Sequence, residues 1–481
     1  MEKASTVKGH KASAREVARA FFVFFATAVV IVCASVLKFV LVEDVKARFT
    51  VVSYILFAIV IIVILSGHFV YVASSRTEVL KNIRLFSAVY TAIGFTVVAN
   101  VWLEKINSFL MPAMLAAFIV ATLANGRDAF CANIFTNILI LFILLTQNHL
   151  TQSTHYYAVV SKFAQGLTGG SIVAYWIKNS VKRLNFLLKG LFVASLSVLA
   201  VFAVVTAFNG QVLNLVEIGF LAGGTLGQVI VAVVLQPIFE TVFNLVTNTR
   251  LVELTDHNAP LIKRLKEEAP GTFNHSLAVA NFAEICASAI GENPYLARAC
   301  AYYHDVGKLA NPQYFKENQG DMNPHDGLLP EVSAEIIRNH ATEGKKLCDE
   351  YRIPSEVSDI TVEHHGTLPI YVFYAKAKQL TDGEVDMDWY SYHGRTPVSK
   401  IAAIIMLCDS GEAAIRAMDN PDAERVDALL RKLIHDRIQA GQFDNCSISL
   451  RDLDTIRQTI INAYGGQFHK RLRYPDGGSN L

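Results

Sequence analysis

The sequence predicts an all-α protein in two parts, a polytopic transmembrane helical bundle followed by a helical domain outside the membrane. Three observations lead to this prediction. Of the 481 residues, 52% are hydrophobic and 18% are charged, a composition shifted toward apolar residues relative to soluble proteins. Long apolar runs follow one another up to about residue 240, and charged residues return at normal density from Thr255 onward. Beyond Pro270, apolar residues recur at spacings of three and four, and strand-like alternation is scarce.

The first half of the chain holds eight apolar segments close to the length that a helix needs to cross a bilayer, about 20 residues. They lie at residues 20–42, 50–72, 83–103, 109–125, 130–149, 157–177, 187–208 and 214–238. The first segment is longer than the apolar core of a cleaved signal peptide, which has about 7 to 15 residues, so we expect a retained anchor. The sixth has the weakest signal because it contains the polar, glycine-rich stretch SKFAQGLTGG. We therefore predict about eight spans.

Basic residues distinguish the two sides of this bundle. Lys and Arg concentrate in the N-terminus and in loops at 74–84, 125–130 and 178–189, which alternate with loops of little or no net positive charge. Since Lys and Arg accumulate on the cytoplasmic side, we expect a multi-pass protein of the inner (plasma) membrane. Its N-terminus and its C-terminal domain would both be cytoplasmic. The external loops are short, so a signal from outside would have to act through the helices themselves.

Charges and glycines inside the apolar segments raise separate questions. Lys38 and Glu217 lie near span ends, and we expect their side chains to reach the membrane interface. Gly223 and Gly227 have the G-x-x-x-G spacing of close helix contacts. Packing inside a monomeric bundle is the simpler explanation of that spacing, and a homodimer stays open.

Composition also limits the other parts and partners. The net charge of +1 gives no reason to expect a nucleic-acid polymer as a partner. The seven cysteines are scattered and contain no C-x-x-C, so they are expected to be reduced thiols without a disulfide framework. The predicted parts are a basic N-terminus (1–19), a transmembrane domain of one span plus seven (20–248), a helical coupling segment (249–270), a helical cytosolic domain (271–475) and a tail (476–481).

The cytosolic domain carries His and Asp on five successive predicted helices. These residues are His275, His304, Asp305, His340, His364, His365 and Asp409. A helical bundle can direct side chains from several helices at one internal point, which is how di-metal carboxylate sites are built. Mixed imidazole and carboxylate ligands suit iron or manganese as well as zinc, and the lack of a Cys partner argues against a closed structural zinc site. Any one of these histidines alone would be unremarkable, whereas the ordered set predicts a metal centre.

The order H…HD…H…HH…D, with HDVGK (304–308) and EHHGT (363–367) at its centre, resembles the HD-domain phosphohydrolases. The stretch from Leu251 to Pro475 is similar to the cytosolic domain of the seven-transmembrane HD family, whose members are cyclic di-AMP phosphodiesterases. Further local matches are EAPGTFNHSLAVANFAE and AAIIMLCDS. The resemblance implies a cytosolic all-helical HD domain and a membrane-anchored enzyme that hydrolyses cyclic di-AMP to linear pApA.

The resemblance also implies a role for each residue. His275, His304, Asp305 and Asp409 would bind one divalent metal, and Asp305, His340, His364 and His365 the other, with manganese or iron as the expected ions. Asp305 would bridge the two, and Lys308 would contact the phosphate. Two such ions activate a water and clamp the attacking and leaving oxygens of a displacement at phosphorus, so no protein nucleophile is needed. Arg395 and the loops at 318–326 and 392–400 are expected to line the substrate pocket.

The sequence specifies the substrate and the regulation of the protein less closely than the metal ligands. The related enzymes for cyclic di-GMP carry a Gly-Tyr-Pro element after the paired histidines, and this chain continues HHGTLPIYVFYAKAK, which favours adenine. Cyclic di-GMP or a guanosine polyphosphate remain alternative substrates, and a receptor or transporter whose HD domain only binds nucleotide is an alternative function. The family normally has a large external domain after its first span, reduced here to EDVKARF (43–49), which leaves control by an external ligand in doubt.

Overall fold

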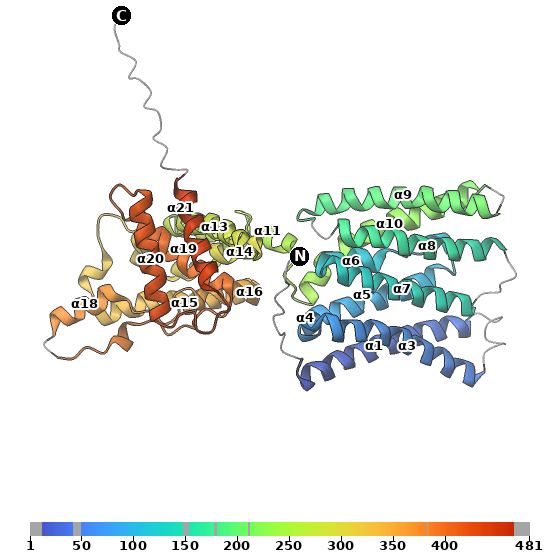
Figure 1. Cartoon of the computed structure of the whole chain (residues 1–481), viewed down its shortest axis with the longest axis horizontal. Coiled ribbons are helices and arrows are strands. Elements are labelled where there is room, and N and C mark those ends of the chain that lie inside the picture. Colours follow the sequence, from blue (N-terminus) through green and yellow to red (C-terminus); the bar gives the residue numbers. More distant parts are fainter. Residues whose placement is uncertain are drawn as a thin grey trace, which may run out of the picture. The chain divides into compact units, whose positions relative to one another are not determined.

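The structure is a computed structural model that describes residues 12–41, 50–147, 153–177, 180–209, 212–381 and 383–465. The chain divides into two compact units, Met1–Thr249 and Arg250–Leu481 (Figure 1). Among the described residues every regular element is a helix, and the one β-bridge, between Pro369 and Ser391, is isolated. The all-α prediction is confirmed.

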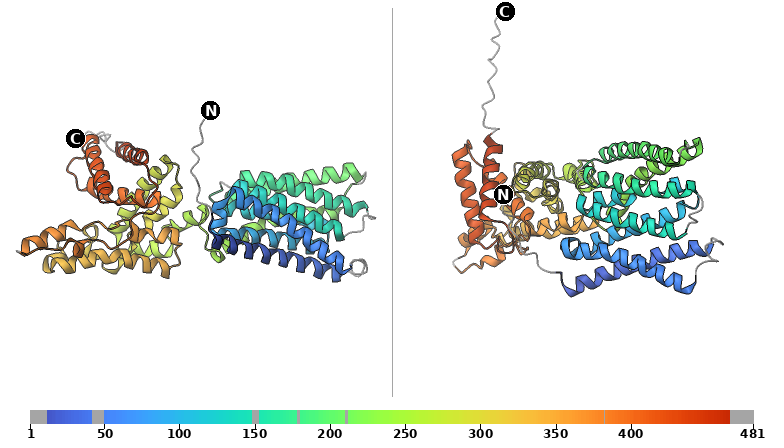
Figure 2. Two further views of the ribbon diagram at one scale, coloured as in Figure 1. Left: turned by 60° about the horizontal axis from the view of Figure 1, so that its bottom comes forward. Right: turned by 45° about the vertical axis from the view of Figure 1, so that its right-hand side comes forward.

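The first unit is a bundle of long apolar helices that run alongside one another in both views of Figure 2. Its elements are α1 (Ala14–Leu41), α3 (Val51–Ser75), α4 (Thr77–Lys81), α5 (Ile83–Leu103), η1 (Ser108–Leu110), α6 (Leu115–Leu123), α7 (Gly126–Gln147), α8 (Ser153–Trp176), α9 (Arg183–Asn209) and α10 (Leu215–Val242). Six of the described helices are long and apolar enough to cross a membrane, namely α1, α3, α5, α7, α9 and α10. The prediction of a polytopic bundle is confirmed, and these six match six of the predicted spans.

The other two predicted spans differ from simple membrane helices. The segment 109–125 is interrupted between η1 and α6 at Pro112, which has no backbone N–H to continue a helix. The nine residues of α6 extend only about 14 Å. The sixth, α8, has 24 residues but is too polar to count with the six, because it carries Lys162 and Gln165 in its middle. The fourth and sixth predicted spans thus differ from the other six, and the sixth is the one with the weakest signal in the sequence.

Three ion pairs between buried or half-buried side chains lie in this unit. Lys38 on α1 forms an ion pair with Glu104, the residue that caps the C-terminal end of α5, and is only 4% exposed. The Arg76–Asp128 and Arg183–Glu240 pairs have N–O distances of 2.9 and 3.2 Å. Pairing lowers the cost of removing these charges from water.

Glu217 does lie at a helix end. Its carboxylate accepts from the backbone N–H of Asn214 while the Asn214 side chain accepts from the Glu217 N–H, a capping box that starts α10.

The second unit is a helical domain built around α19. Its elements are α11 (Asn248–Leu254), α12 (Pro260–Glu268), α13 (Pro270–Ala289), α14 (Pro294–Tyr303), η2 (Val306–Ala310), η3 (Pro312–Tyr314), η4 (Lys316–Asn318), η5 (Pro324–Gly327), α15 (Pro330–Glu350), α16 (Ser355–Ser358), α17 (Ile360–Glu363), α18 (Tyr371–Leu380), η6 (Met387–Tyr390), α19 (Lys400–Arg416), α20 (Ala423–Gln439) and α21 (Leu450–Gly465). Every residue from Ile401 to Asp409 is buried, as expected for a helix that is apolar all round. Helix α13 packs against α14, α19 and α21.

Residues 249–270, predicted as a helical coupling segment, form two short helices. Helix α11 ends at Leu254, and α12 starts at Pro260, whose fixed φ suits the first position of a helix. Helix α13 likewise starts with a proline, Pro270, and has His275 in its second turn.

Candidate metal centre

Gly307 brings the HDVGK segment against α15. His304 caps the C-terminus of α14, Asp305 follows it, and η2 then runs along α15. A Cβ atom at position 307 would lie 1.8 Å from the backbone oxygen of His340 and 2.4 Å from the nitrogen of Gly344. Only a residue without a Cβ permits this approach. The glycine thus allows Asp305 to come within reach of the His340 imidazole.

A second glycine ends the helix that carries the paired histidines. Helix α17 ends at Glu363, His364 and His365 follow, and Gly366 turns the chain with φ of +55°, a conformation that favours glycine. Both histidines therefore follow directly after the last residue of a short helix.

The seven predicted side chains lie together in the interior of the second unit. One group contains His275, His304, Asp305 and Asp409, and the other contains Asp305, His340, His364 and His365. Within each group, one potential ligand atom of every residue lies within 4.8 Å of the others. Asp305 belongs to both groups, as the resemblance implied for a bridging ligand.

In the first group, carboxylate oxygens face two imidazoles. The Nε2 atom of His275 lies 3.0 Å from Oδ1 of Asp409 and 3.7 Å from Oδ2 of Asp305. The Nε2 atom of His304 lies 3.1 Å from Oδ2 of Asp305 and 3.7 Å from Oδ1 of Asp409. Four ligands from three segments of the chain thus surround one point.

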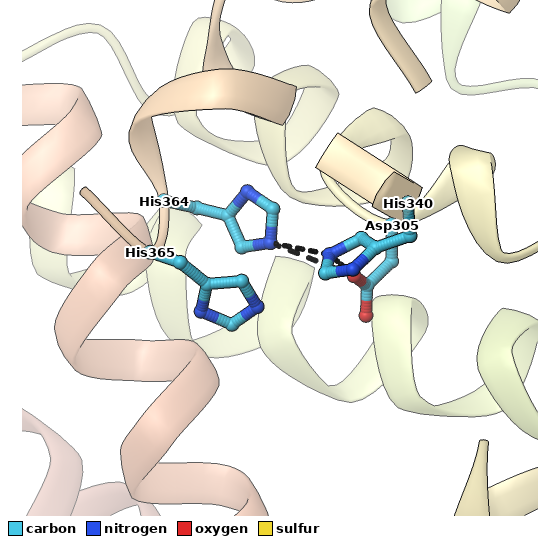
Figure 3. A group of neighbouring side chains, drawn as sticks. All are labelled: Asp305, His340, His364 and His365. Carbon is cyan, nitrogen blue, oxygen red and sulfur yellow. Dashed lines mark hydrogen bonds and ion pairs between the residues drawn. The ribbon is translucent and has the colours of Figure 1, made fainter. Parts of the chain in front are cut away.

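In the second group, the other oxygen of Asp305 faces two more imidazoles (Figure 3). Its Oδ1 atom lies 3.3 Å from Nε2 of His340 and 3.6 Å from Nε2 of His364. The His365 ring lies beside that of His364, with ring centroids 3.9 Å apart. The two carboxylate oxygens of Asp305 therefore point to different groups.

The backbone sets the tautomers of three histidines. Nδ1 donates to a backbone carbonyl in His304, His340 and His364, at distances of 2.7, 2.5 and 3.0 Å. In the neutral rings, Nε2 then carries a lone pair and no proton. Such orientation by a backbone carbonyl is typical of metal-bound imidazoles.

Several of these atoms lack a suitable partner within the protein. The Nε2 atoms of His340 and His364 face each other at 3.3 Å, with no proton between them in the neutral rings. The buried atoms His304 Nε2 and Asp305 Oδ1 have no hydrogen-bond partner among the described residues. Convergent buried lone pairs are costly unless a cation binds them, so the residues present fit divalent metal ions.

The carboxylates control protonation in the first group. Burial alone would lower the pKa of His275, but hydrogen bonds with Asp409 and Glu412 outweigh it and raise the pKa to about 9. The His304 pKa rises to about 10, because Asp305 and Asp409 outweigh burial in the same way. The pKa of Asp305 lies well below its ordinary value, since His304 and Lys308 outweigh burial. The first group therefore binds protons when no metal competes for it.

The second group has the opposite tendency. Burial lowers the pKa of His364. Burial and the neighbouring His364 hold the pKa of His365 well below its usual value. These imidazoles are neutral at pH 7, the state that binds a metal.

Lys308 lies between two carboxylates. Its Nζ atom is 2.7 Å from Oδ2 of Asp305 and 2.7 Å from Oε1 of Glu317, which also accepts from the Thr272 hydroxyl. These carboxylates outweigh burial and raise the lysine pKa. Lys308 is thus a fixed positive charge beside the shared ligand, and its predicted phosphate contact remains a proposal.

Two contacts with the ligands were not predicted from the sequence. The Glu412 carboxylate accepts from Nδ1 of His275 at 2.7 Å, and it follows Asp409 by three residues on α19. That i, i+3 spacing puts both carboxylates on one helix face and was the available signal. Tyr392 belongs to the segment 392–400 that was expected near the substrate, and its stacking on His365, with ring centroids 4.2 Å apart, is the contact that the sequence did not indicate.

A cavity of about 420 Å³ opens beside His365. Residues from α15 and from the 392–395 segment line it, including Arg338, Tyr392 and Arg395. The Arg395 guanidinium also lies 3.1 Å from Asp359 and 3.3 Å from Glu363. None of the residues 318–326 lines this cavity, and their place in the substrate pocket stays a prediction.

Two family profiles match the chain. One, described as "7TM receptor with intracellular HD hydrolase", matches residues 48–247, and the other, "HD domain", matches residues 272–414. The chain thus contains a membrane part like that of the seven-transmembrane HD family and an HD domain. Together with the six apolar helices, this likeness identifies it as a membrane protein.

Individual relatives extend the likeness across both units. Cyclic-di-AMP phosphodiesterase PgpH of Listeria monocytogenes is 35% identical over 440 residues, which cover 89% of this chain and 60% of the relative. The protein of the same name from Bacillus subtilis is 36% identical, with 82% and 56% covered. The chain thus spans less than two thirds of these relatives.

A solved structure also matches. The crystal structure of the L. monocytogenes PgpH HD domain in complex with cyclic-di-AMP is 42% identical, and the match covers 45% of this chain and 100% of that one with a TM-score of 0.43.

Proposed function

We propose that this chain belongs to the seven-transmembrane HD family and is a metal-dependent phosphodiesterase that hydrolyses cyclic di-AMP to linear pApA. The observation that carries the proposal is the paired group of ligands that shares Asp305. The names of the two PgpH relatives support the substrate. The likeness to that family and the apolar helices support anchoring in the lipid bilayer.

The metal ligands of the proposal are the seven residues of the two groups. His275, His304, Asp305 and Asp409 would hold one ion, and Asp305, His340, His364 and His365 the other. Nitrogen and oxygen donors without sulfur suit manganese or iron. Two such ions would supply an activated water and neutralise charge that develops on the phosphate.

The protein supplies orientation and charge for this reaction. Backbone carbonyls fix the rings of three histidines, and Glu412 fixes that of His275. Lys308 holds a positive charge beside Asp305, where it would stabilise the negative charge of the reacting phosphate. The cavity beside His365 would receive the rest of the nucleotide, with Tyr392 available to stack and Arg395 to bind base or phosphate.

The proposal also covers topology. The basic loops at 74–84, 125–130 and 178–189 support a plasma-membrane protein whose N-terminus and HD domain are cytoplasmic. Reaction with a membrane-impermeant thiol reagent tests this in intact cells. A cysteine introduced by Ser447→Cys in the HD domain should react only after the cells are opened.

A homodimer through α10 is a separate part of the proposal. A Cβ atom at Gly219, Gly223 or Gly227 would meet no described atom within 4 Å, so packing inside the bundle does not require these glycines. Cross-linking in nanodiscs loaded with one or two chains would test the dimer, and Gly223→Leu should disrupt it.

The enzymatic proposal is tested with the purified full chain. With Mn²⁺ or Fe²⁺ it should convert cyclic di-AMP to pApA, and Asp305→Ala should abolish turnover while the exposed Asp419→Ala should leave it unchanged. If the protein turned over cyclic di-GMP or a guanosine polyphosphate faster than cyclic di-AMP, the proposed substrate would be wrong. Stoichiometric nucleotide binding without turnover under either metal would favour a receptor or transporter instead.

A further inference from the structure

Lys162 is a buried lysine in the membrane unit for which the described residues provide no carboxylate. It lies on α8, its side chain is 1% exposed, and its ammonium donates to the Thr225 hydroxyl oxygen at 3.3 Å. In contrast, Lys38, Arg76 and Arg183 of the same unit each have an acidic partner. An ionisable side chain inside a membrane bundle is costly, so its retention without a counter-ion calls for a function.

The neighbours of Lys162 add further unused hydrogen-bonding capacity. An ammonium has three donors, and only the bond to Thr225 is present among the described residues. The Thr225 oxygen also accepts from the Gln165 side chain at 3.1 Å, which leaves the Thr225 hydroxyl proton to donate elsewhere. The buried Gln165 Oε1 atom has no partner in the described part of the chain. The cluster therefore offers an amine and a hydroxyl with free donors that an anionic group would satisfy, beside one free acceptor.

A groove adjoins this cluster through Gln165, whereas Lys162 and Thr225 lie behind Gln165 and do not line it. It lies between α8 and α9 and has a volume of about 350 Å³. Ser161 and Gln165 form one end, and the wall runs along α8 to Trp176, about 22 Å away by the helix rise. Except for Thr168 and Ser197, the rest of the wall is apolar or glycine. The groove therefore combines one polar end with a long apolar body.

The interrupted fourth segment adjoins the same cluster. The η1 turn packs against both α8 and α10. A Cβ atom at Gly224, the residue before Thr225, would lie 2.6 Å from Leu110 of η1, so this glycine permits the contact. Irregular backbone at membrane depth is typical of places where a membrane protein binds a ligand.

We propose that the groove binds a long-chain carboxylate, a free fatty acid, whose head accepts from Lys162 and Thr225 and whose chain lies along α8 and α9. An anion would hold the Lys162 amine in its charged form, and the single polar end selects a head-and-tail molecule. Gln165 links the two parts, since it lines the groove and shares the Thr225 hydroxyl with Lys162. This site is separate from the metal centre and does not depend on the proposed hydrolase activity.

The test measures binding of radiolabelled palmitate to the full chain in phosphatidylcholine nanodiscs. The wild type should bind saturably, and Lys162→Met should weaken binding at least tenfold. Ala200→Phe, which places a ring in the groove from its exposed α9 wall, should do the same without touching the polar cluster. The control Lys105→Met removes an exposed lysine of the same unit and should bind like the wild type.

Competitors define the chemistry of the ligand. Unlabelled palmitate should displace the label, whereas palmitic acid methyl ester should not, because it lacks the anion. The proposal is overturned if Lys162→Met binds like the wild type or if the methyl ester competes equally. If an equal amount of phosphatidylglycerol displaced the labelled palmitate, the proposed fatty acid would be wrong and the site would be assigned to a lipid phosphate.

Discussion

The metal centre and the Lys162 cluster are both groups of buried polar side chains that the described protein atoms do not fully satisfy. In the metal centre, lone pairs from seven residues converge on two points, and carboxylates outnumber the fixed positive charges. In the membrane unit, donors and positive charge prevail around Thr225. The first arrangement suits cations and the second suits an anion. The sign of the unsatisfied groups therefore indicates the class of ligand before any ligand is seen.

The largest expected effect tests whether one carboxylate joins the two groups of the metal centre. Asp305→Ala removes one carboxylate oxygen from each group of ligands. Loss of a hydrogen-bond partner behind a metal ligand costs up to roughly 100-fold in metal affinity, and loss of the ligand itself should lower both affinities further. Elemental analysis after dialysis should find less than one metal per chain, against two in the wild type. Retention of two metals would show that the groups are independent of Asp305.

The next effect concerns Glu412, which orients His275 without belonging to either group. Glu412→Ala should weaken metal binding about 10- to 100-fold and leave the helical content unchanged. Glu412→Gln keeps an acceptor for the His275 N–H and should recover much of the affinity. The matched control is the exposed Glu267→Gln. Metal titration measures the affinity of each variant. A metal affinity of Glu412→Ala equal to that of the wild type would show that Glu412 does not position His275.

Acidity should affect metal binding through the first group. The pKa values of His275 and His304 are raised to about 9 and about 10, so at pH 7 the metal-free protein holds both protons. A metal must displace them, and its apparent affinity should fall as the pH falls, by about tenfold per pH unit for each proton released. Calorimetry in two buffers of different ionisation enthalpy counts these protons. Binding without proton release would contradict the raised pKa values.

The smallest effect tests the Lys162 cluster by stability. In nanodiscs without fatty acid, Lys162→Met should be more stable than the wild type by about 1–2 kcal/mol, because it removes a buried charge with one partner. For the paired Lys38, the change to Met should destabilise, since it leaves Glu104 buried without its cation. Thermal unfolding compares the two variants. A loss of stability in Lys162→Met would indicate a structural lysine.

The seven candidate ligands could be predicted because their identity and order along five helices carry the pattern. Glu412 was missed because its role depends on which nitrogen of His275 faces it, and this is set by how α13 packs on α19. The partners of Lys308 were missed for a similar reason, since Glu317 reaches it across a turn that has no helical periodicity.

In the membrane unit, the positions of helices that follow from the length of an apolar run were predicted well. Features that depend on contacts between polar side chains were predicted less well. The break at Pro112 lies inside a run apolar enough to look continuous. The ion pair of Lys38 with Glu104 was not predicted, because it joins residues far apart in sequence. Lys162 lies in the weakest predicted span, and its burial depends on Thr225 from α10. Contacts between distant segments cannot be read from local hydropathy.

Gly307 has a consequence for how this protein can evolve. The residue contacts the backbone of α15 and offers no ligand atom, yet any side chain there would separate Asp305 from His340. In a saturation mutagenesis screen for metal-dependent growth, position 307 should tolerate substitution as poorly as the ligands themselves. Because the clash is with backbone atoms, no single compensating side-chain change can restore the lost variants, and this position constrains every lineage that keeps the site.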